Sequence, residues 1–272
     1  MKKLIDLFTY QPIDLNNKSV KNLLPYSLNS LLPNKKKAAF TLAEVLITLG
    51  IIGVVAALTI PSLINYFKVK QLEVQFKKAD SIITQALKKT ADEAGYDSIS
   101  DLNIPGRKVT SENYAQLQKQ VEELNEIWLR QFTSITPVSN TLISRKNLKC
   151  TGLVGTTVMF PNCWISMGPS YQLQDGLTVT GLAAQNGGAN HPGLITFMFD
   201  TNGPFNGPNR WGYDIFRVYS DLNYDKSLCN PTIQNSGNQF GCYYWAKNNI
   251  NPKDKSTPYW NILYKPLSYW QK

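Results

Sequence analysis

The sequence predicts an α+β fold in which a long N-terminal helix packs on a C-terminal antiparallel β-sheet. Three observations support this prediction. An apolar run of membrane-spanning length extends from Phe40 to Ile60, and a helical stripe of apolar residues continues from Val69 to Ala94. From Cys150 onward, short β-prone segments alternate with Gly, Pro and Asn. A helical half followed by a series of strands is typical of α+β domains.

Residues 1–39 are predicted to be a cytoplasmic leader. They contain seven lysines and two aspartates, and so account for more than half of the formal net charge of +9. Lysines that directly precede an apolar run favour the cytoplasmic side of the membrane, so the chain beyond Pro61 is expected to be exported. Because the positive charge is concentrated in the leader, no nucleic-acid partner is expected for the folded part.

The apolar run, residues 40–61, is predicted to be a transmembrane helix. At about 1.5 Å per residue it is roughly 30 Å long, which matches the hydrocarbon core of a bilayer. Its single charged residue is Glu44. A carboxylate in a membrane costs about 2.5–3.5 kcal/mol near the centre, so it usually has a partner or a function. The alternative is a side chain that reaches the lipid headgroups from the edge of the membrane.

The string AFTLAEVL from Ala39 to Leu46, which follows a lysine run, resembles the cleavage and methylation signature of type IV pilins and type II secretion pseudopilins. The resemblance implies a pilin-like fold and cleavage before Phe40 by a prepilin peptidase that also methylates the new amine. The family usually has Gly before the cut, where this chain has Ala39. Gly53 and Pro61 also fall where the family has Gly and Pro, residues that weaken a helix interior.

The resemblance further implies how the chain would assemble. A carboxylate at Glu44 would be compensated in an apolar filament core by the amine of Phe40 in a neighbouring subunit. The expected partners are other pilin or pseudopilin subunits, the peptidase, an inner-membrane assembly platform and membrane lipid. The expected location is the inner membrane as a single-pass protein, with a periplasmic or extracellular C-terminal domain, and then a filament. The filament is either a type II secretion pseudopilus or a type IV pilus, and the chain's length favours a minor subunit.

Residues 62–149 are predicted to form an amphipathic helix and a helical insertion. The first helix is expected to bend at Pro61 and to end near Ala94, with Gly95 as its C-cap. Its apolar stripe is expected to pack on the protein's own sheet, with a coiled-coil partner as the alternative. A second helix is expected from Ser111 to Phe132, with Ser111 as its N-cap.

Residues 150–272 are predicted to form a β-rich exported domain. The step Asp175-Gly176 suits a hairpin with a tight primed turn, because both residue types tolerate positive φ angles. The expected strands are Gly155–Phe160, Cys163–Met167, Tyr171–Gln174, Leu177–Leu182, Leu194–Phe199, Asp214–Tyr219 and Phe240–Trp245.

Four cysteines in an exported domain favour disulfides. The simplest connectivity pairs Cys150 with Cys163 and Cys229 with Cys242, although four cysteines allow three connectivities. A zinc site is less favoured, because the sequence has no C-x-x-C and its one histidine, His191, is isolated.

The segment from Asp200 to Asp214 is the densest group of polar residues, and it allows two interpretations. Asp200, Asn202 and Asp214 offer oxygen ligands of the kind that calcium binds, and some pseudopilins hold calcium. The segment does not follow EF-hand spacing. The alternative, which we favour, is an ordered turn in which Asn and Asp bond to the nearby backbone and Gly supplies positive φ angles.

The C-terminal tail from Tyr243 to Trp270 is rich in Tyr and Trp. Such a tail could provide a binding surface, and a membrane-tethered binding module is therefore the alternative function. No grouping of Ser, His and Asp or of Cys and His, and no phosphate-binding loop, is visible in the sequence. We therefore predict a structural subunit and not an enzyme, with no cofactor other than possible calcium.

Overall fold

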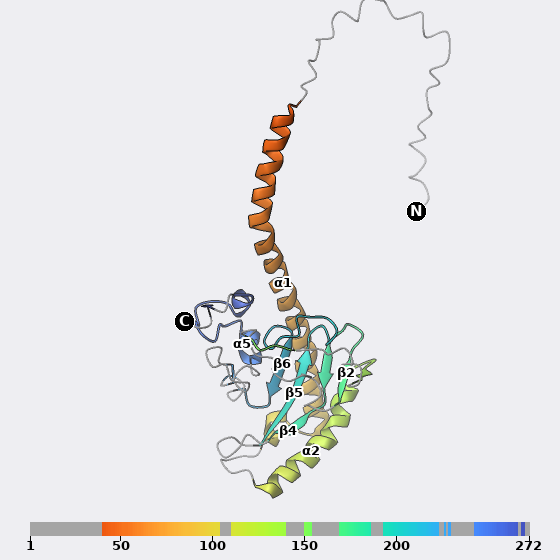
Figure 1. The fold of residues 1–272 in the computed structure, drawn as a ribbon. Helices are drawn as coiled ribbons and strands as arrows, with labels where there is room; N and C mark the ends of the chain where they lie inside the picture. The colour runs from red at the N-terminus through yellow and green to blue at the C-terminus, as the bar shows by residue number, and fades with distance from the viewer. Residues whose placement is uncertain are drawn as a thin grey trace, which may run out of the picture. The chain divides into compact units, whose positions relative to one another are not determined.

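A computed structural model of the 272-residue chain describes residues 40–103, 110–139, 150–153, 169–185, 193–222, 226, 228–229, 242–265 and 268–269. The chain divides into two compact units, Met1–Ala57 and Leu58–Lys272. The helix α1 begins in the first unit, and the second unit contains the remaining helices and the sheet (Figure 1).

The helix α1 runs from Leu42 to Ala94 and continues through Pro61. It ends at the predicted place, because Gly95 follows with a φ of 80°, a left-handed conformation that favours glycine. The amide of Tyr96 then donates to the carbonyl of Ala91 (2.9 Å), which closes the end of the helix.

Among the described residues, six short strands form one antiparallel sheet, as the α+β prediction requires. The order is β1-β2-β3-β5-β4, and β6 pairs with β5. The longest strand, β5, holds three neighbours together (Figure 1). The strands are β1 (Thr136–Val138), β2 (Ser170–Gln172), β3 (Thr178–Thr180), β4 (Ala183–Gln185), β5 (Leu194–Asp200) and β6 (Ile215–Tyr219).

The core lies between the second half of α1, the helix α2 (Ser111–Arg130) and one face of the sheet. Phe76 of α1 contacts Phe199 of β5 and Phe216 of β6, with ring centroids 6.1 and 4.7 Å apart. Trp128 of α2 contacts Phe197 of β5 at 5.1 Å. The predicted stripe on α1 is therefore buried against the protein's own sheet, and its buried members are Leu72, Phe76, Ala79, Ile83, Ala86 and Thr90.

Two details of the helical and hairpin predictions were wrong. The N-cap of α2 is Thr110 and not Ser111, because Thr110 and Asn113 form a reciprocal capping box. The β2–β3 hairpin forms as predicted, but only Gly176 has a positive φ, so its turn is not a two-residue primed turn. The loop from Leu173 to Leu177 closes it through an amide-to-carbonyl bond of 2.8 Å.

The predicted strand Phe240–Trp245 was also wrong, because residues Tyr243–Asn248 form a helix, α5. Asn249 adopts a left-handed φ of 53°, and the amides of Asn249 and Ile250 bond to carbonyls of the last turn. This Schellman-type ending stabilises a short helix that tyrosine and tryptophan would not predict. A 3-10 turn, η5 (Tyr259–Ile262), follows, and another, η2 (Ile99–Leu102), follows α1.

Strands β1 and β4 were not predicted, since three-residue strands carry too little alternation to recognise. The predicted strands Gly155–Phe160 and Cys163–Met167 lie outside the described residues.

Candidate functional site

The first turn of α1 holds the side chain of Glu44 in a capping box with Thr41. The carboxylate oxygen Oε2 accepts hydrogen bonds from the Thr41 amide (2.8 Å) and the Thr41 hydroxyl (3.0 Å). The Glu44 amide donates in return to the Thr41 hydroxyl oxygen (3.2 Å). The Thr-x-x-Glu spacing in the sequence is a signature of a helix start. The resemblance to pilins had instead suggested that Glu44 pairs with the amine of a neighbouring subunit.

Apolar side chains are exposed along the helix that follows Glu44. Phe40 is 83% exposed, and large aliphatic residues stay at least 40% exposed through Ile64. Within the described part of the chain, α1 is the helix long and apolar enough to cross a membrane, by length and composition. The predicted processing residue Ala39 lies outside the described residues. Gly53 and Pro61 both lie inside the continuous helix.

The polar loop between β5 and β6 is braced by its two carboxylates. Asp200 Oδ1 accepts from the amides of Asn202 (3.0 Å) and Gly203 (2.9 Å). The two oxygens of Asp214 accept from the amides of Asn209 (2.8 Å) and Arg210 (2.7 Å). These are the backbone bonds expected of the ordered-turn interpretation.

Both carboxyl groups are fully buried, and burial changes their acidity. Burial and the neighbouring Asp214 raise the pKa of Asp200 well above its usual range, against opposing bonds from the Asn202 and Gly203 amides. Burial raises the pKa of Asp214 to about 7, again against opposing amide bonds. A pair of buried carboxyls of this kind is stabilised when it binds a proton or a cation.

The loop also contains three buried oxygens that have no hydrogen-bond partner among the described residues: Asp200 Oδ2, Asn202 Oδ1 and Asn209 Oδ1. Calcium requires six to eight oxygen ligands, so this set fits a calcium ion only if backbone carbonyls or water supply the rest. Asp214, a predicted ligand, already uses each oxygen to hold a backbone amide, and Asn209 was not predicted. Among the described residues, no group of three or more His, Cys, Asp or Glu side chains could hold a metal.

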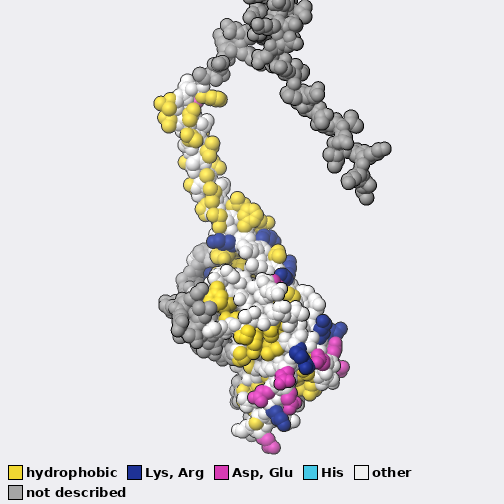
Figure 2. Space-filling view, turned by 90° about the vertical axis from the view of Figure 1, so that its right-hand side faces the viewer, with side chains coloured by type: hydrophobic (Ala, Val, Ile, Leu, Met, Phe, Trp, Pro, Cys, Tyr) yellow, Lys and Arg dark blue, Asp and Glu magenta, His cyan; other side chains and the backbone are white. Residues whose placement is uncertain are grey.

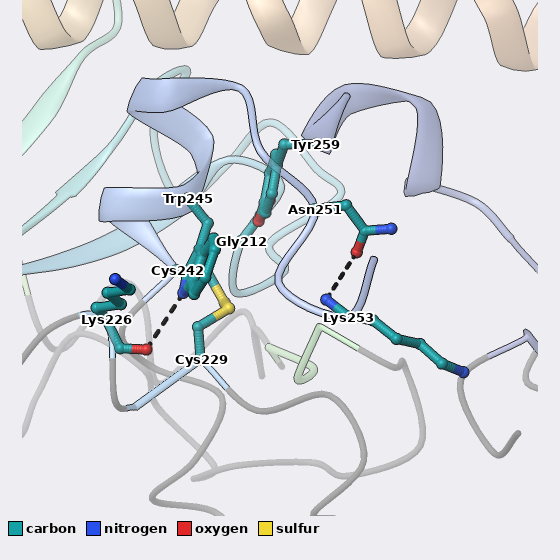
Figure 3. The surroundings of a disulfide bond; sticks show 8 residues. All are labelled: Gly212, Lys226, Cys229, Cys242, Trp245, Asn251, Lys253 and Tyr259. Carbon is teal, nitrogen blue, oxygen red and sulfur yellow. Dashed lines mark hydrogen bonds between the residues drawn. A yellow bond between two sulfur atoms is a disulfide. The ribbon is translucent and has the colours of Figure 1, made fainter. Parts of the chain in front are cut away.

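The cysteines Cys229 and Cys242 form a disulfide that joins the start of α5 to the preceding segment (Figure 3). Beside it, the Trp245 indole N–H donates to the carbonyl of Lys226 (3.2 Å), and the Tyr259 hydroxyl donates to the carbonyl of Gly212 (2.7 Å). Cys150 is buried. Its predicted partner Cys163 lies outside the described residues, so that pairing stays a prediction. His191 also lies outside the described residues.

Most of the described aromatic residues of the C-terminal tail pack into the core. Trp260 of η5 contacts Phe76 of α1 at 5.2 Å. Tyr243, Trp245, Tyr259 and Trp260 are buried, and Tyr244, Tyr264 and Tyr269 are half-buried. Trp270 lies outside the described residues. The feature that suggested a membrane-tethered binding module therefore has a structural explanation.

Comparison with known families finds a match near the start of the chain. Residues 34–60 match the prokaryotic N-terminal methylation motif, which is the prepilin-type signature. No curated protein and no solved structure matches the chain. The match contains the lysine run, Phe40 and Glu44, and so confirms the resemblance on the residues that carried it.

The motif and the fold together point to a class of protein. A prepilin-type signature, the one membrane-length apolar helix among the described residues and an α+β unit are consistent with a pilin-like, single-pass membrane protein. The motif implies processing by a prepilin peptidase and assembly with other pilin-type subunits. It indicates a structural protein.

Proposed function

We propose that the chain is a subunit, and by its size a minor subunit, of a type II secretion pseudopilus or a type IV pilus. The observation that carries the proposal is the methylation motif at residues 34–60, at the start of a helix whose apolar side chains are exposed. Exposed aliphatic side chains in such a number require lipid or neighbouring helices to cover them. The chain acts in this proposal as a structural part and not as an enzyme.

In the proposed assembly step, the Glu44 carboxylate exchanges its bonds with Thr41 for a bond with the amine of Phe40 in a neighbouring subunit. In the single chain, the carboxylate bonds to the Thr41 amide and hydroxyl. Cleavage before Phe40 creates a cationic amine, and a charged donor binds a carboxylate more strongly than a neutral donor does. In the apolar centre of a filament, the neighbouring subunit's amine at Phe40 compensates the Glu44 charge and fixes the stagger between subunits.

The proposed topology follows from the same segment. The lysines at 35–37 hold the leader in the cytoplasm, and the unit after Pro61 is exported to the periplasm or the cell surface. An inner-membrane assembly platform would then lift the cleaved chain out of the bilayer. Exposure to an oxidising compartment is consistent with the disulfide between Cys229 and Cys242.

The test is intact-mass and N-terminal analysis of the membrane-extracted chain from its native host, with a Glu44→Ala variant assayed for incorporation into sheared filaments. We expect a mature chain that begins with methylated Phe40, and loss of incorporation in the variant. The matched control is Glu93→Ala, which removes an exposed carboxylate near the other end of the same helix, where it pairs with Arg130.

Two results would contradict the proposal. One is a chain that keeps its lysine leader in the native membrane. The other is a processed Glu44→Ala chain that enters filaments as well as Glu93→Ala does.

For the loop from Asp200 to Asp214 we propose an ordered turn that can also take up calcium. Asp200, Asn202 and Asn209 would contribute the oxygens that lack a partner, and a bound cation would offset the buried carboxylates. The test compares the unfolding temperature of the full chain in detergent with calcium and with a chelator. A rise with calcium that Asp200→Asn abolishes supports binding, and equal temperatures restrict the loop to its structural role.

A further inference from the structure

The polarity of α1 changes in a definite order just beyond Pro61. Leu63 and Ile64 are 52% and 47% exposed, although they follow the predicted end of the membrane segment. Tyr66 and Phe67 come next, 56% and 61% exposed, with their rings in an edge-on contact at 5.8 Å. Lysines appear only after these aromatic residues. Figure 2 shows hydrophobic side chains giving way to lysines along the helix.

The stretch without charge is longer than the predicted span. Between Glu44 and Lys68 the sequence has no Asp, Glu, Lys or Arg, which leaves the 23 residues from 45 to 67. As a helix they measure about 35 Å, slightly more than the roughly 30 Å of a hydrocarbon core, which a modest tilt accommodates. A boundary at Pro61 would instead leave Leu63, Ile64 and Phe67 in water at a cost in free energy.

The residues at the end of this stretch have the chemistry of a membrane interface. Tyrosine and other amphipathic aromatics concentrate at the headgroup level, and lysines place their ammonium groups among lipid phosphates. Lys68 is exposed and has no ion pair in the described part of the chain. Lys70 bonds to Glu73 at 2.9 Å, and Glu73 also bonds to Lys77, so ion pairs between side chains of the helix begin there.

We propose that Tyr66, Phe67 and Lys68 form an interfacial anchor that binds the phospholipid headgroups of the outer leaflet and sets the depth of α1 in the membrane before assembly. The embedded segment then runs from residue 45 to residue 67, with Glu44 at the opposite interface. Continuity with the membrane-length helix and the positive charge of Lys68 identify an anionic lipid surface as the partner. The inference depends on membrane insertion and not on filament assembly.

The test measures which positions along the helix are accessible to water. The full chain is reconstituted in vesicles of phosphatidylcholine and phosphatidylglycerol, without other pilin proteins, and single cysteines are labelled with a membrane-impermeant maleimide. Ser62→Cys and Asn65→Cys probe the disputed segment, and Gln71→Cys is the matched exposed control. All three side chains are exposed on α1 in the absence of lipid. The unmodified chain gives the background from the native cysteines.

We expect labelling at position 62 to be at least tenfold slower than at position 71 in vesicles, and equal to it after full denaturation. Equal labelling at both positions in vesicles would overturn the proposal and place the boundary at Pro61. Protection at position 71 as well would also overturn it, because the anchor would then lie inside the bilayer.

A second arm tests the lysine. In the Asn65→Cys background, Lys68→Glu should increase labelling several-fold in vesicles with phosphatidylglycerol and less in pure phosphatidylcholine. The same increase in both lipids, or no increase in either, would overturn the headgroup contact of Lys68. Because no filament forms in this assay, its failure would leave the Glu44 experiment unaffected.

Discussion

Phe76 joins α1 to the sheet and to the C-terminal tail, so its removal should destabilise the whole unit Leu58–Lys272. It is 2% exposed, and its ring contacts Phe216 of β6, Trp260 of η5 and two further aromatic residues at 4.7 to 6.1 Å. Phe→Ala in a core costs about 3–5 kcal/mol, which combines lost burial with the cavity left behind. Several aromatic contacts are lost together, so we expect about 4 kcal/mol for Phe76→Ala.

The assay is urea unfolding of the full chain in mild detergent, followed by tryptophan fluorescence. With a slope of about 2 kcal/mol per molar urea, the expected loss lowers the midpoint by about 2 M. The control is Val74→Ala, two residues away on the same helix, where the side chain is 65% exposed. It should change stability by less than about 0.5 kcal/mol. A cost below about 1 kcal/mol for Phe76→Ala, or an equal cost for both variants, would refute the packing of α1 on the sheet.

Three further predictions concern the loop and the disulfide. Gly212→Ala should cost about 1–3 kcal/mol in thermal unfolding, because φ is 76° and a Cβ would lie 2.6 Å from the Tyr259 hydroxyl; an unchanged unfolding temperature would contradict this. The pKa of Asp214 is about 7 in the folded state and about 3.9 in the unfolded state. The contribution of Asp214 to stability, measured with a chelator present, should therefore be fully present below about pH 4 and lost as the pH rises through about 7. Asp214→Asn should make stability less dependent on pH in this range. Replacing both Cys229 and Cys242 with Ser should cost about 3 kcal/mol in urea unfolding, since the two cysteines lie 13 positions apart in the sequence, and a reductant should lower the stability of the unmodified chain by more than that of the variant.

The candidate assembly segment could be predicted from the sequence, because each of its signals is local. The lysine run, Glu44 and most of the uncharged helix lie within residues 34–60, the range that matches the methylation motif. The Thr-x-x-Glu spacing also indicates a capping box between Thr41 and Glu44. This partner was missed because the prediction considered only a partner for Glu44 in another subunit. In the polar loop, by contrast, Asn209 was missed because nothing in its neighbours shows which oxygen lacks a hydrogen-bond partner.

The sequence by itself determined the α+β class, the course of α1 to Ala94, the glycine that ends it and the β2–β3 hairpin. Helical periodicity, glycine at a helix end and an Asp-Gly step act over a few residues, so they can be read without the rest of the chain. Only the tertiary structure decided that Tyr243–Asn248 is a helix and that Trp260 packs against Phe76. Those outcomes depend on contacts between residues far apart in sequence. Aromatic side chains occur in strands, in binding surfaces and in cores, so only the residues that cover them decide between the three.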